Sequence, residues 1–370
     1  MPARRWSVGI LALLLLAAAA AGWWLLRPFE PVRTTVVQEG LEHPWDIAFA
    51  DDGRMLVTER IGRVRIFAGP EAGAELLHTS AIPDVRAELE SGLMGIAVDG
   101  SSVFVCATRG AADPASWQVQ LLRATLRSDG TLSAFAALPV GPIRGAPRHQ
   151  GCAVEIDAAS DVWLSIGDAN LPAGENAAQD PGALNGKILR VHPDGTVPAD
   201  NPLGPDSPVF SFGHRNPQGL AFGPDGLVVA VEHGTDENDE INLIEPGGNY
   251  GYPCFTGMDS VGPITDGCGP AADYLAPAWE SGAPTLATSG ITFLAGAAWG
   301  DWEGDLVVTT LKEEDLRRFT LADDGSAEEA ETLLDGRFGR LRAAVIGPDG
   351  ALYLSTANGD DRIIRVEPAG

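Results

Sequence analysis

His149 and Asp168 are the residues of this sequence best suited to moving a proton. His149 lies in GAPRHQGCAVEI, directly before an apolar, strand-like stretch, and Asp168 follows the next such stretch in SIGDAN. Two strands joined by a tight turn bring their outer ends together, so the carboxylate can orient the imidazole and raise its basicity. His149 is therefore a candidate general base. The alternative is an ordinary surface or turn histidine.

Basic side chains flank strand-like stretches elsewhere in the chain. Arg215 and Asn216 lie in FGHRNPQGLAF, where a planar guanidinium could hold a carboxylate or a quinone oxygen. Lys312 follows DLVVTTL, and Arg340 and Arg342 flank one residue in RFGRLRAAVIGPDG. If these last three cations share one region, they form a positive patch that predicts an anionic ligand. Taken singly, Arg215 could be an ordinary turn residue, and the other three cations could be ordinary surface charges.

The loop VEHGTDENDEINLIEPGGNYGYP is a candidate cation site. Its acidic residues Asp236, Glu237, Asp239 and Glu240 lie beside glycines that leave backbone carbonyls free to face a cation. Hard oxygen ligands in a flexible loop suit Ca²⁺ better than zinc or copper. The alternative is a solvated acidic loop, and the sequence contains no EF-hand, HExxH or CxxC pattern.

The elements that must position these residues are six copies of one hairpin. Each copy has an apolar stretch, an acidic or Asp-Gly turn, and a second alternating strand, and Asp-Gly turns tolerate the positive φ that hairpins need. One copy per about 57 residues leaves room for a four-stranded sheet and a loop. The copies begin at Pro44, Gly92, Gly151, Pro217, Ser289 and Leu341.

This repeat predicts an all-β fold, a six-bladed β-propeller of four-stranded antiparallel blades over residues 31–370, with residues 245–285 as an insertion. A two-sheet sandwich is the competing fold, but it leaves the six similar copies unexplained. Because a propeller gathers loops from every blade at one end of its channel, candidate residues that are remote in sequence can meet there.

Composition supports a globular protein and excludes one class of partner. The 370 residues include 45 Gly and 27 Pro, which disfavours a helical bundle. With 45% apolar residues the chain can bury a large core. Its 25 Lys and Arg against 51 Asp and Glu give a net charge of −26, so the molecule repels polyanions and a nucleic-acid partner is not expected.

Residues 1–30 resemble an export signal rather than part of the fold. Arg4 and Arg5 precede an apolar run over residues 8–26, which is long enough to cross a bilayer as a helix. Small residues at 17–21 suit cleavage of a signal peptide, whereas the apolar residues that follow suit an uncleaved anchor. Both remain open. In either case we expect a periplasmic or extracellular protein, attached to the inner membrane only through this segment if at all.

Export into an oxidising compartment allows disulfides. Cys254 and Cys268 bound a Gly- and Pro-rich stretch that a cross-link would stabilise, so we expect them to pair. Cys106 and Cys152 each lie in an apolar, strand-like segment, and their simplest interpretation is as small buried hydrophobic residues.

Together these motifs resemble the soluble, pyrroloquinoline-quinone (PQQ) dependent sugar dehydrogenases, the glucose/sorbosone dehydrogenase family. The resemblance runs from about Leu41 to Val366 and is carried by GHRNPQGLAF, DEINLI with GGNYGYP, NGKILRV with DGTVPADNP, and RLR with GPDG. It implies a six-bladed propeller, as the repeats do, with PQQ and Ca²⁺ as cofactors, an aldose as substrate, and an electron acceptor that the sequence does not identify.

The resemblance also implies roles for single residues. His149 would take the proton of the anomeric hydroxyl, with Asp168 as its support and Arg215 in the catalytic centre. The cofactor's carboxylates and quinone oxygens would be held by Arg215, Asn216, Lys312, Arg340 and Arg342. The carbonyls of Gly234 and Thr235 would bind the Ca²⁺ ion that polarises the cofactor. A second, structural Ca²⁺ ion would lie at Asp239, Glu240 and Tyr250.

Three positions depart from the family pattern. Thr235 stands where some relatives have Pro, Glu90 where glucose-oxidising relatives have Gln, and Ala343 where an acidic residue is common. These differences bear on which sugar is preferred more than on the cofactor. Two other functions suit a propeller: a Ca²⁺-dependent sugar lactonase without a quinone, and a binding protein without activity.

Overall fold

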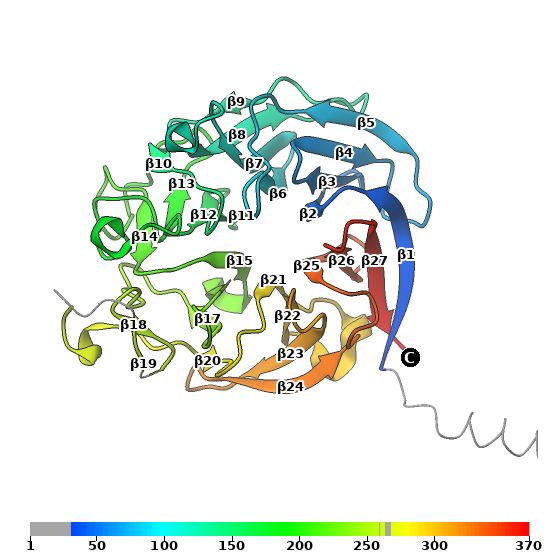
Figure 1. The fold of residues 1–370 in the computed structure, drawn as a ribbon. Coiled ribbons are helices and arrows are strands. Elements are labelled where there is room, and N and C mark those ends of the chain that lie inside the picture. The colour runs from blue at the N-terminus through cyan, green and yellow to red at the C-terminus, as the bar shows by residue number, and fades with distance from the viewer. Residues whose placement is uncertain (1–30, 259, 263–267, 370) are drawn as a thin grey trace, which may run out of the picture.

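The computed structural model describes residues 31–369 apart from 259 and 263–267, and within these limits the chain is a ring of antiparallel sheets (Figure 1). The sheets surround a central axis, and the first strand of each hairpin copy lies innermost. The predicted six-bladed propeller of four-stranded blades is thus confirmed, and residues 1–30 lie outside the described part.

Blades 1 to 3 follow one another along the chain. Blade 1 consists of β2 (Pro44–Phe49), β3 (Met55–Glu59), β4 (Arg63–Phe67) and β5 (Leu76–Ala81). Blade 2 consists of β6 (Leu93–Asp99), β7 (Ser102–Arg109), β8 (Gln118–Thr125) and β10 (Ile143–Arg144), with β9 (Ala136–Ala137) also paired to β8. Blade 3 consists of β11 (Gly151–Ile156), β12 (Val162–Ile166), β13 (Lys187–Val191) and β14 (Val209–Phe212).

Blades 4 to 6 complete the ring. Blade 4 consists of β15 (Pro217–Phe222), β16 (Val228–Glu232), β17 (Glu240–Leu243) and β20 (Trp279–Glu280). Blade 5 consists of β21 (Thr288–Phe293), β22 (Leu306–Thr310), β23 (Leu316–Leu321) and β24 (Ala327–Leu333). Blade 6 consists of β25 (Leu341–Ile346), β26 (Leu352–Thr356), β27 (Asp361–Pro368) and, as its outer strand, β1 (Val32–Leu41).

The ring is closed by the first strand of the described chain. β1 pairs antiparallel with β27, so blade 6 is built from both ends of the described chain (Figure 1). The sequence repeats did not predict this closure, because β1 lies before the first hairpin copy. Helix is confined to five short 3₁₀ segments in the described part: Pro114–Ser116, Ala173–Glu175, Pro224–Gly226, Ala271–Asp273 and Ala297–Trp302. Among the described residues there is no helix of sufficient length and apolarity to span a membrane.

Each predicted hairpin forms the inner two strands of a blade. In all six, the ladder between these strands shifts register near the start of the inner strand, as at a β-bulge. Glycines at this level let neighbouring inner strands approach: a Cβ on Gly95, Gly219 or Gly290 would lie 2.4–2.5 Å from the backbone of the next blade. The bulges redirect side chains toward the channel mouth.

The insertion predicted at residues 245–285 is shorter in the structure, where residues 244–278 separate β17 from β20 and the rest of the predicted range contains β20, a strand of blade 4. It contains the small hairpin of β18 (Phe255–Thr256) and β19 (Ser260–Val261). Cys254 and Cys268 are joined in a disulfide, as expected. This bond ties together a segment that otherwise contributes little regular structure.

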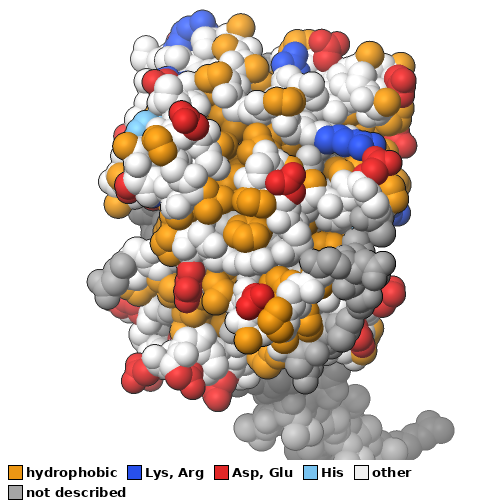
Figure 2. Space-filling view, turned by 90° about the vertical axis from the view of Figure 1, so that its left-hand side faces the viewer, with side chains coloured by type: hydrophobic (Ala, Val, Ile, Leu, Met, Phe, Trp, Pro, Cys, Tyr) orange, Lys and Arg blue, Asp and Glu red, His pale blue; other side chains and the backbone are white. Residues whose placement is uncertain are grey.

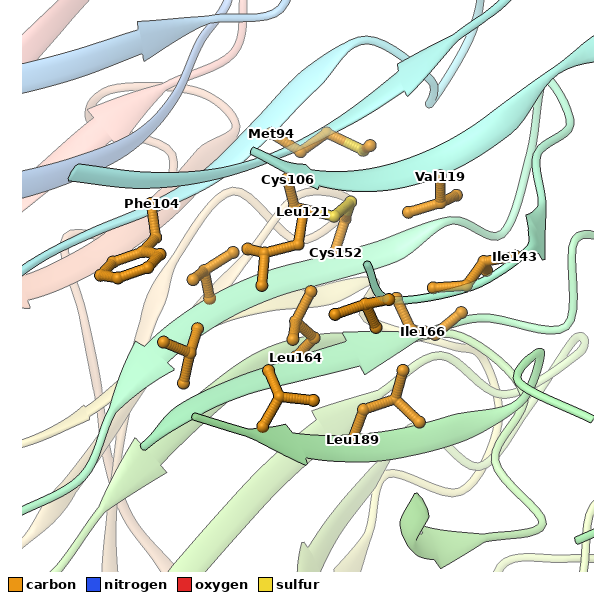
Figure 3. Packing of buried hydrophobic residues seen from close by; sticks show 14 of the residues in the cluster. Met94, Phe104, Cys106, Val119, Leu121, Ile143, Cys152, Leu164, Ile166 and Leu189 are labelled. Atoms are coloured by element: carbon orange, nitrogen blue, oxygen red, sulfur yellow. A yellow bond between two sulfur atoms is a disulfide. The ribbon is translucent and has the colours of Figure 1, made fainter. Parts of the chain in front are cut away.

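Cys106 and Cys152 correct the sequence interpretation. Both are fully buried, but they form a second disulfide rather than serving only as hydrophobic residues. The bond joins β7 of blade 2 to β11 of blade 3 inside the core shared by these blades (Figure 3). Because it closes a separation of 46 residues, loop entropy assigns it about 4 kcal/mol, against about 3 kcal/mol for a separation of 14 in the other bond.

Candidate active site

The predicted site residues lie at one end of the blades. They stand either at the start of an inner strand or just after the strand paired to it, and antiparallel pairing brings these positions together: Gly151 pairs with Ile166, and Pro217 with Glu232. Contacts between blades then join the positions around the ring. The amide of Gly151 in blade 3, for example, donates to Asn216 Oδ1 before blade 4 at 3.1 Å.

His149 and Asp168 form the predicted pair. His149 Nδ1 and Asp168 Oδ1 are 2.7 Å apart, and the side chains are 10% and 1% exposed. With its N–H directed at an acceptor-only carboxylate, Nδ1 is the protonated nitrogen, so Nε2 is left as the basic atom. The geometry can therefore remove a proton from a hydroxyl group that reaches Nε2.

Backbone conformation holds this pair in an uncommon arrangement. His149 has φ of 55°, and Ala169 and Asn170 have φ of 59° and 49°. Left-handed conformations at residues other than glycine cluster at functional sites. Gly167 is required here, because a Cβ on it would lie 2.2 Å from the carbonyl oxygen of His149.

The Asp168 carboxylate is saturated with donors. Besides His149, Oδ1 accepts the amide of Asn170 at 2.8 Å, and Oδ2 accepts Asn176 Nδ2 at 2.8 Å. Tyr252 lies beside it: burial, reinforced by the Asp168 charge, raises the pKa of the Tyr252 phenol to about 12. The sequence analysis missed both Asn176 and Tyr252, which lie in loops without a periodic pattern.

Arg215 and Asn216 occupy the next sector. The Arg215 amide donates to Glu232 Oε2 at 2.7 Å, and its Nη1 donates to the carbonyl of His233 at 3.1 Å. Its Nε is buried without a partner in the described part of the chain. Asn216 is fully buried, and its Oδ1 also accepts Gln218 Nε2 at 2.9 Å. Arg215 thus retains a donor for a ligand.

Glu90 joins the site from blade 2. Its Oε2 accepts the amide of His149 at 2.9 Å and faces Asn216 Nδ2 at 3.4 Å. Burial alone would raise the pKa of Glu90, but the His149 amide and the nearby charges of His149, His233 and Arg148 bring it below the ordinary value. Glu90 is therefore a carboxylate that contacts the backbone of the candidate base, His149.

His233 was not predicted, although it lies in the VEHG segment after a strand. Its Nε2 is 2.7 Å from the carbonyl of Thr288, so this nitrogen donates, and Nδ1 is left to face Asn216. Burial lowers the pKa of His233, against the opposing charges of Asp239 and Glu90. With Nε2 as the donor to Thr288, Nδ1 can accept from the Asn216 amide and so orient it.

The three predicted cations meet on the other side of the mouth. Arg340 Nη1 donates to the carbonyl of Leu311 at 3.0 Å, which brings Arg340 beside Lys312. Among the described residues, the one hydrogen-bond contact of Lys312 Nζ is with Thr285 Oγ1, at 3.4 Å. Arg340 and also Arg60, which the sequence analysis missed, act on the charge of Arg342. Arg60 directly follows β3, and Lys312 is the second residue after β22, so both lie just past the second strand of a hairpin and the repeat itself contained the signal.

Arg342 lies deeper than its neighbours. Its guanidinium carbon is 3.7 Å from the centroid of the Trp45 ring, and Nη1 is 3.4 Å from Gln218 Oε1. Burial, together with the charge of Arg340, lowers its pKa to about 9. It lines a channel cavity of about 30 Å³ together with Asp46 and Glu155.

These cations are unpaired. Within the described residues, none of Arg60, Arg215, Lys312, Arg340 and Arg342 forms an ion pair with a carboxylate. On the outer strands the opposite holds, since basic residues such as Arg317 and Arg365 pair with acidic neighbours. In a protein of net charge −26, unpaired cations gathered at one channel mouth mark a site for an anion.

The expected calcium ligands are only partly brought together. The Gly234 amide donates to Asp239 Oδ1, whereas Asp239 Oδ2 accepts the amide of Leu286 at 2.8 Å. Among the described residues, the carbonyls of Gly234 and Thr235 accept no hydrogen bond, as a cation site requires. No cluster of three acidic, His or Cys residues able to hold a metal ion occurs in the described part.

The second calcium set does not fit as it stands. Glu240 accepts the amide of Gly257 at 2.6 Å and Asn242 Nδ2 at 3.0 Å, and burial beside Glu232 raises its pKa to about 8. Tyr250 donates to the carbonyl of Leu243 and accepts the amide of Glu245 at 2.8 Å. The side chains of Glu240 and Tyr250 are thus already engaged by donors and acceptors of the protein, and the second calcium site stays a prediction.

A larger cavity lies away from this chemistry. It has a volume of about 680 Å³ between the outer parts of blades 2 and 3, on a face along whose middle hydrophobic side chains gather (Figure 2). Among its lining residues only Arg144 and Asp206 are ionisable. It contains no pair that could transfer a proton, so the channel mouth remains the candidate site.

Known proteins match the chain along almost its whole length. A family model described as Glucose / Sorbosone dehydrogenase matches residues 41–365. An uncharacterized protein of Synechocystis is 31% identical over 91% of this chain and 86% of its own. The aldose sugar dehydrogenase of Escherichia coli is 29% identical over 91% of this chain and 93% of its own. The solved PQQ-bound aldose sugar dehydrogenase of Streptomyces coelicolor has a TM-score of 0.76 and 29% identity over 92% of this chain and 99% of that one.

Proposed function

The chain belongs to the glucose/sorbosone dehydrogenase family of sugar-oxidising enzymes, and from this premise we propose that it oxidises the anomeric hydroxyl of an aldose to a lactone with PQQ as the hydride acceptor. The observation that carries the proposal is the juxtaposition at one channel mouth of the 2.7 Å His149–Asp168 pair and a group of unpaired cations.

The residues present fit PQQ. The cofactor carries three carboxylates and two quinone oxygens, and it needs donors that no other residue has claimed. Arg60 and Arg215 each have a buried Nε without a partner in the described part of the chain. Within the described ranges, the side chain of Lys312 makes one long contact and that of Arg340 one contact to a carbonyl, so their charges remain available. When bound, PQQ supplies the electrophilic carbon that receives hydride from the sugar.

In the proposed reaction His149 is the general base. Its Nε2 takes the proton of the anomeric hydroxyl while Asp168 holds the Nδ1–H and stabilises the imidazolium that forms. The peptide amide of His149 is fixed by Glu90, so the ring is anchored at the backbone as well as at Nδ1. A base held in this way loses little entropy when the substrate hydroxyl arrives.

The cations bind and orient the cofactor in this proposal. Arg215 and Asn216 lie nearest the base and would contact the quinone oxygens, where negative charge develops on reduction. Lys312, Arg340 and Arg342 would hold carboxylates or quinone oxygens from the opposite side, with Arg342 kept in place by Trp45. Ca²⁺ would lie at the free carbonyls of Gly234 and Thr235, and polarise the bound cofactor.

Reconstitution tests the proposal. Apo protein is titrated with PQQ in the presence of Ca²⁺, and an aldose is then added; we expect a bound-quinone absorbance band that bleaches on addition of the sugar. A Ca²⁺-dependent lactonase would bind no quinone but hydrolyse sugar lactones, and a binding protein would do neither. Either result overturns the proposal.

The proposal includes export from the cytoplasm. Its support is the apolar segment of residues 8–26 and the two disulfides, which persist in oxidising compartments. Cell fractionation of the full chain distinguishes periplasmic, extracellular and inner-membrane protein, and recovery in the cytoplasm with free thiols would contradict it.

A further inference from the structure

We propose that the ammonium group of Lys187 acts as a built-in cation that organises the loop over residues 169–186, and thereby positions Asp168 and His149. Lys187 is a positioning residue in this proposal, remote from substrate and cofactor. The proposal rests on the proposed function for its kinetic test, but its structural test is independent of it.

Lys187 is fully buried at the start of β13. Its Nζ donates to three backbone carbonyls, those of Ala177 and Ala178 at 2.9 Å each and that of Asn185 at 2.7 Å. An ammonium has three N–H donors, so the three contacts use all of them. The carbonyls converge on one positive centre, as they would on a bound metal ion.

Lys187 has no carboxylate partner within ion-pair distance among the described residues. Burial lowers its pKa to about 7, against the charge of Asp180, but three acceptors around Nζ match the three N–H donors of the protonated form. A buried charge without a counter-ion is costly, and an apolar residue at the same place in β13 would avoid that cost. The three carbonyls offset part of it. The remaining cost indicates that the ammonium contributes something an apolar residue could not, namely the ordering of the loop over residues 169–186.

The loop leads directly to Asp168. Asn176, whose Nδ2 holds Asp168 Oδ2 at 2.8 Å, immediately precedes Ala177 and Ala178, whose carbonyls bind Lys187. The same carbonyls also accept the amides of Asp180 at 3.0 Å and Gly213 at 2.9 Å, so without the ammonium each would keep one donor. Losing the shared positive centre would loosen the segment and let Asn176 move relative to the carboxylate. The chain of contacts runs from Lys187 through two peptides to Asn176, Asp168 and His149.

A second connection reaches Asp168 from the other side. Lys187 pairs with Ile166 across the ladder between β12 and β13, two residues before Asp168. Asn185, which gives its carbonyl to Lys187, also donates through Nδ2 to the carbonyl of Gly167 at 3.2 Å. Both ends of the segment that presents Asp168 are thus attached to residues gathered around one ammonium.

The structural test uses apo protein. The Nδ1–H of His149, held 2.7 Å from Asp168, should give a downfield proton resonance, assigned by its loss in His149→Asn. We expect this signal to broaden or disappear in Lys187→Met and to persist in Leu189→Ala, a matched control that removes a buried side chain from the same strand. An unchanged signal in Lys187→Met would overturn the proposal. Because no cofactor is present, this result does not depend on the proposed function.

The kinetic test is a double-mutant cycle. We expect Lys187→Met and Asn176→Ala each to lower kcat about 10- to 100-fold, with the sugar KM and the PQQ affinity within about threefold. Because both act through Asp168, the double variant should be no slower than the worse single one. Independent, multiplying effects, or a fall in Leu189→Ala equal to that in Lys187→Met, would refute the linkage.

If Lys187→Met does not fold, Lys187→Gln provides the same test. Its neutral amide keeps two of the three donors, so kcat and the His149 resonance should lie between those of the wild type and Asn176→Ala. Wild-type values in Lys187→Gln would overturn the proposal. A wild type that never bleaches PQQ would instead refute the proposed function and leave the resonance test standing.

Discussion

The two sides of the channel mouth are built differently. On the side of blades 2 to 4, the polar groups of His149 and Asp168 are buried and bonded to one another or to fixed neighbours. On the side of blades 5 and 6, Lys312 and Arg340 are exposed and make a long contact and a carbonyl contact. On the first side His149 and Asp168 need no ligand to complete their hydrogen bonds, although Arg215 keeps a buried Nε without a partner in the described part of the chain. The second side carries charge that no described carboxylate neutralises.

This difference separates two tasks. A general base must keep its geometry whether or not substrate is present, so its support comes from the protein. A site for a multiply charged ligand must instead leave its charges unpaired, because a cation already paired in the protein gains little by exchanging partners. The polar groups of His149 and Asp168 therefore form hydrogen bonds within the protein. The cations of blades 5 and 6 keep hydrogen-bond donors available for a ligand.

The largest effect should come from the hydrogen-bonded side. His149→Asn removes the base, and we expect kcat for aldose oxidation to fall about 10²- to 10⁴-fold while PQQ binds with unchanged affinity. Turnover with an artificial electron acceptor, together with a PQQ titration, measures both. The matched control is His192→Asn, because His192 makes a similar 2.6 Å contact to Asp161 at an outer turn. Equal losses in the two variants would remove His149 from the mechanism.

A smaller effect, on cofactor affinity rather than on kcat, should come from the cationic side. Lys312→Ala or Arg340→Ala should weaken PQQ binding about 10- to 100-fold, since each removes a charge-assisted hydrogen bond, and should lower kcat at saturating cofactor much less. The control is Arg54→Ala, which removes a cation paired with Asp52 at the opposite end of its blade. Unchanged PQQ affinity in both site variants would show that these charges serve another purpose.

The smallest effect concerns the channel beneath both sides. Burial, reinforced by the charge of Asp46, raises the pKa of Glu155 from 4.5 to about 8. The folded protein therefore binds this proton more tightly than the unfolded chain, and its stability contribution is present below pH 4.5 and lost as the pH rises toward 8. Glu155→Gln cannot titrate, so it should raise Tm by about 2–4 °C at pH 8 and leave it unchanged at pH 4.

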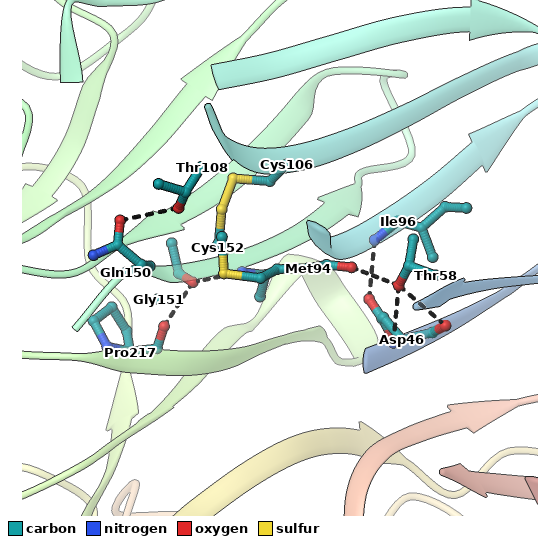
Figure 4. Close-up of a disulfide and its surroundings, with 12 residues drawn as sticks. Asp46, Thr58, Met94, Ile96, Cys106, Thr108, Gln150, Gly151, Cys152 and Pro217 are labelled. Atoms are coloured by element: carbon teal, nitrogen blue, oxygen red, sulfur yellow. Dashed lines mark hydrogen bonds between the residues drawn. A yellow bond between two sulfur atoms is a disulfide. The ribbon is translucent and has the colours of Figure 1, made fainter. Parts of the chain in front are cut away.

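Thermal unfolding of Glu155→Gln beside the exposed control Glu71→Gln checks this. A gain of equal size at both pH values would mean that ionisation is not its cause. Asp46 is unsuited to the same test, because its carboxylate accepts the amides of Ile47 and Ile96 across two blades and has a structural role (Figure 4).

Much of the site followed from local pattern. The Asp-Gly hairpins fixed which residues begin an inner strand and which follow its partner, so His149 and Asp168 could be paired across 19 positions. Lys312 is the second residue after β22, and the same rule would also have found Arg60, which directly follows β3. It was overlooked because its segment, VTERIGR, contains no other unusual residue.

Contacts between blades and within long loops could not be predicted. The Cys106–Cys152 disulfide joins two hairpin copies, and each cysteine alone looks like a buried apolar residue (Figures 3 and 4). Lys187 looks like the polar end of a strand, and only the folded loop brings three carbonyls to it. The stacking of Tyr250 on His214, with ring centroids 4.6 Å apart, likewise joins two loops that are remote in sequence.

The sequence by itself determined the architecture, the end of the blades that carries the chemistry, and the family, because hairpin periodicity and turn residues are local properties written once per repeat. The tertiary structure alone decided which side chains share hydrogen bonds and which charges stay unpaired. Those properties depend on how the inner strands of neighbouring blades meet at their bulges. Distances between segments that are remote in sequence cannot be inferred from the spacing of residues along the chain.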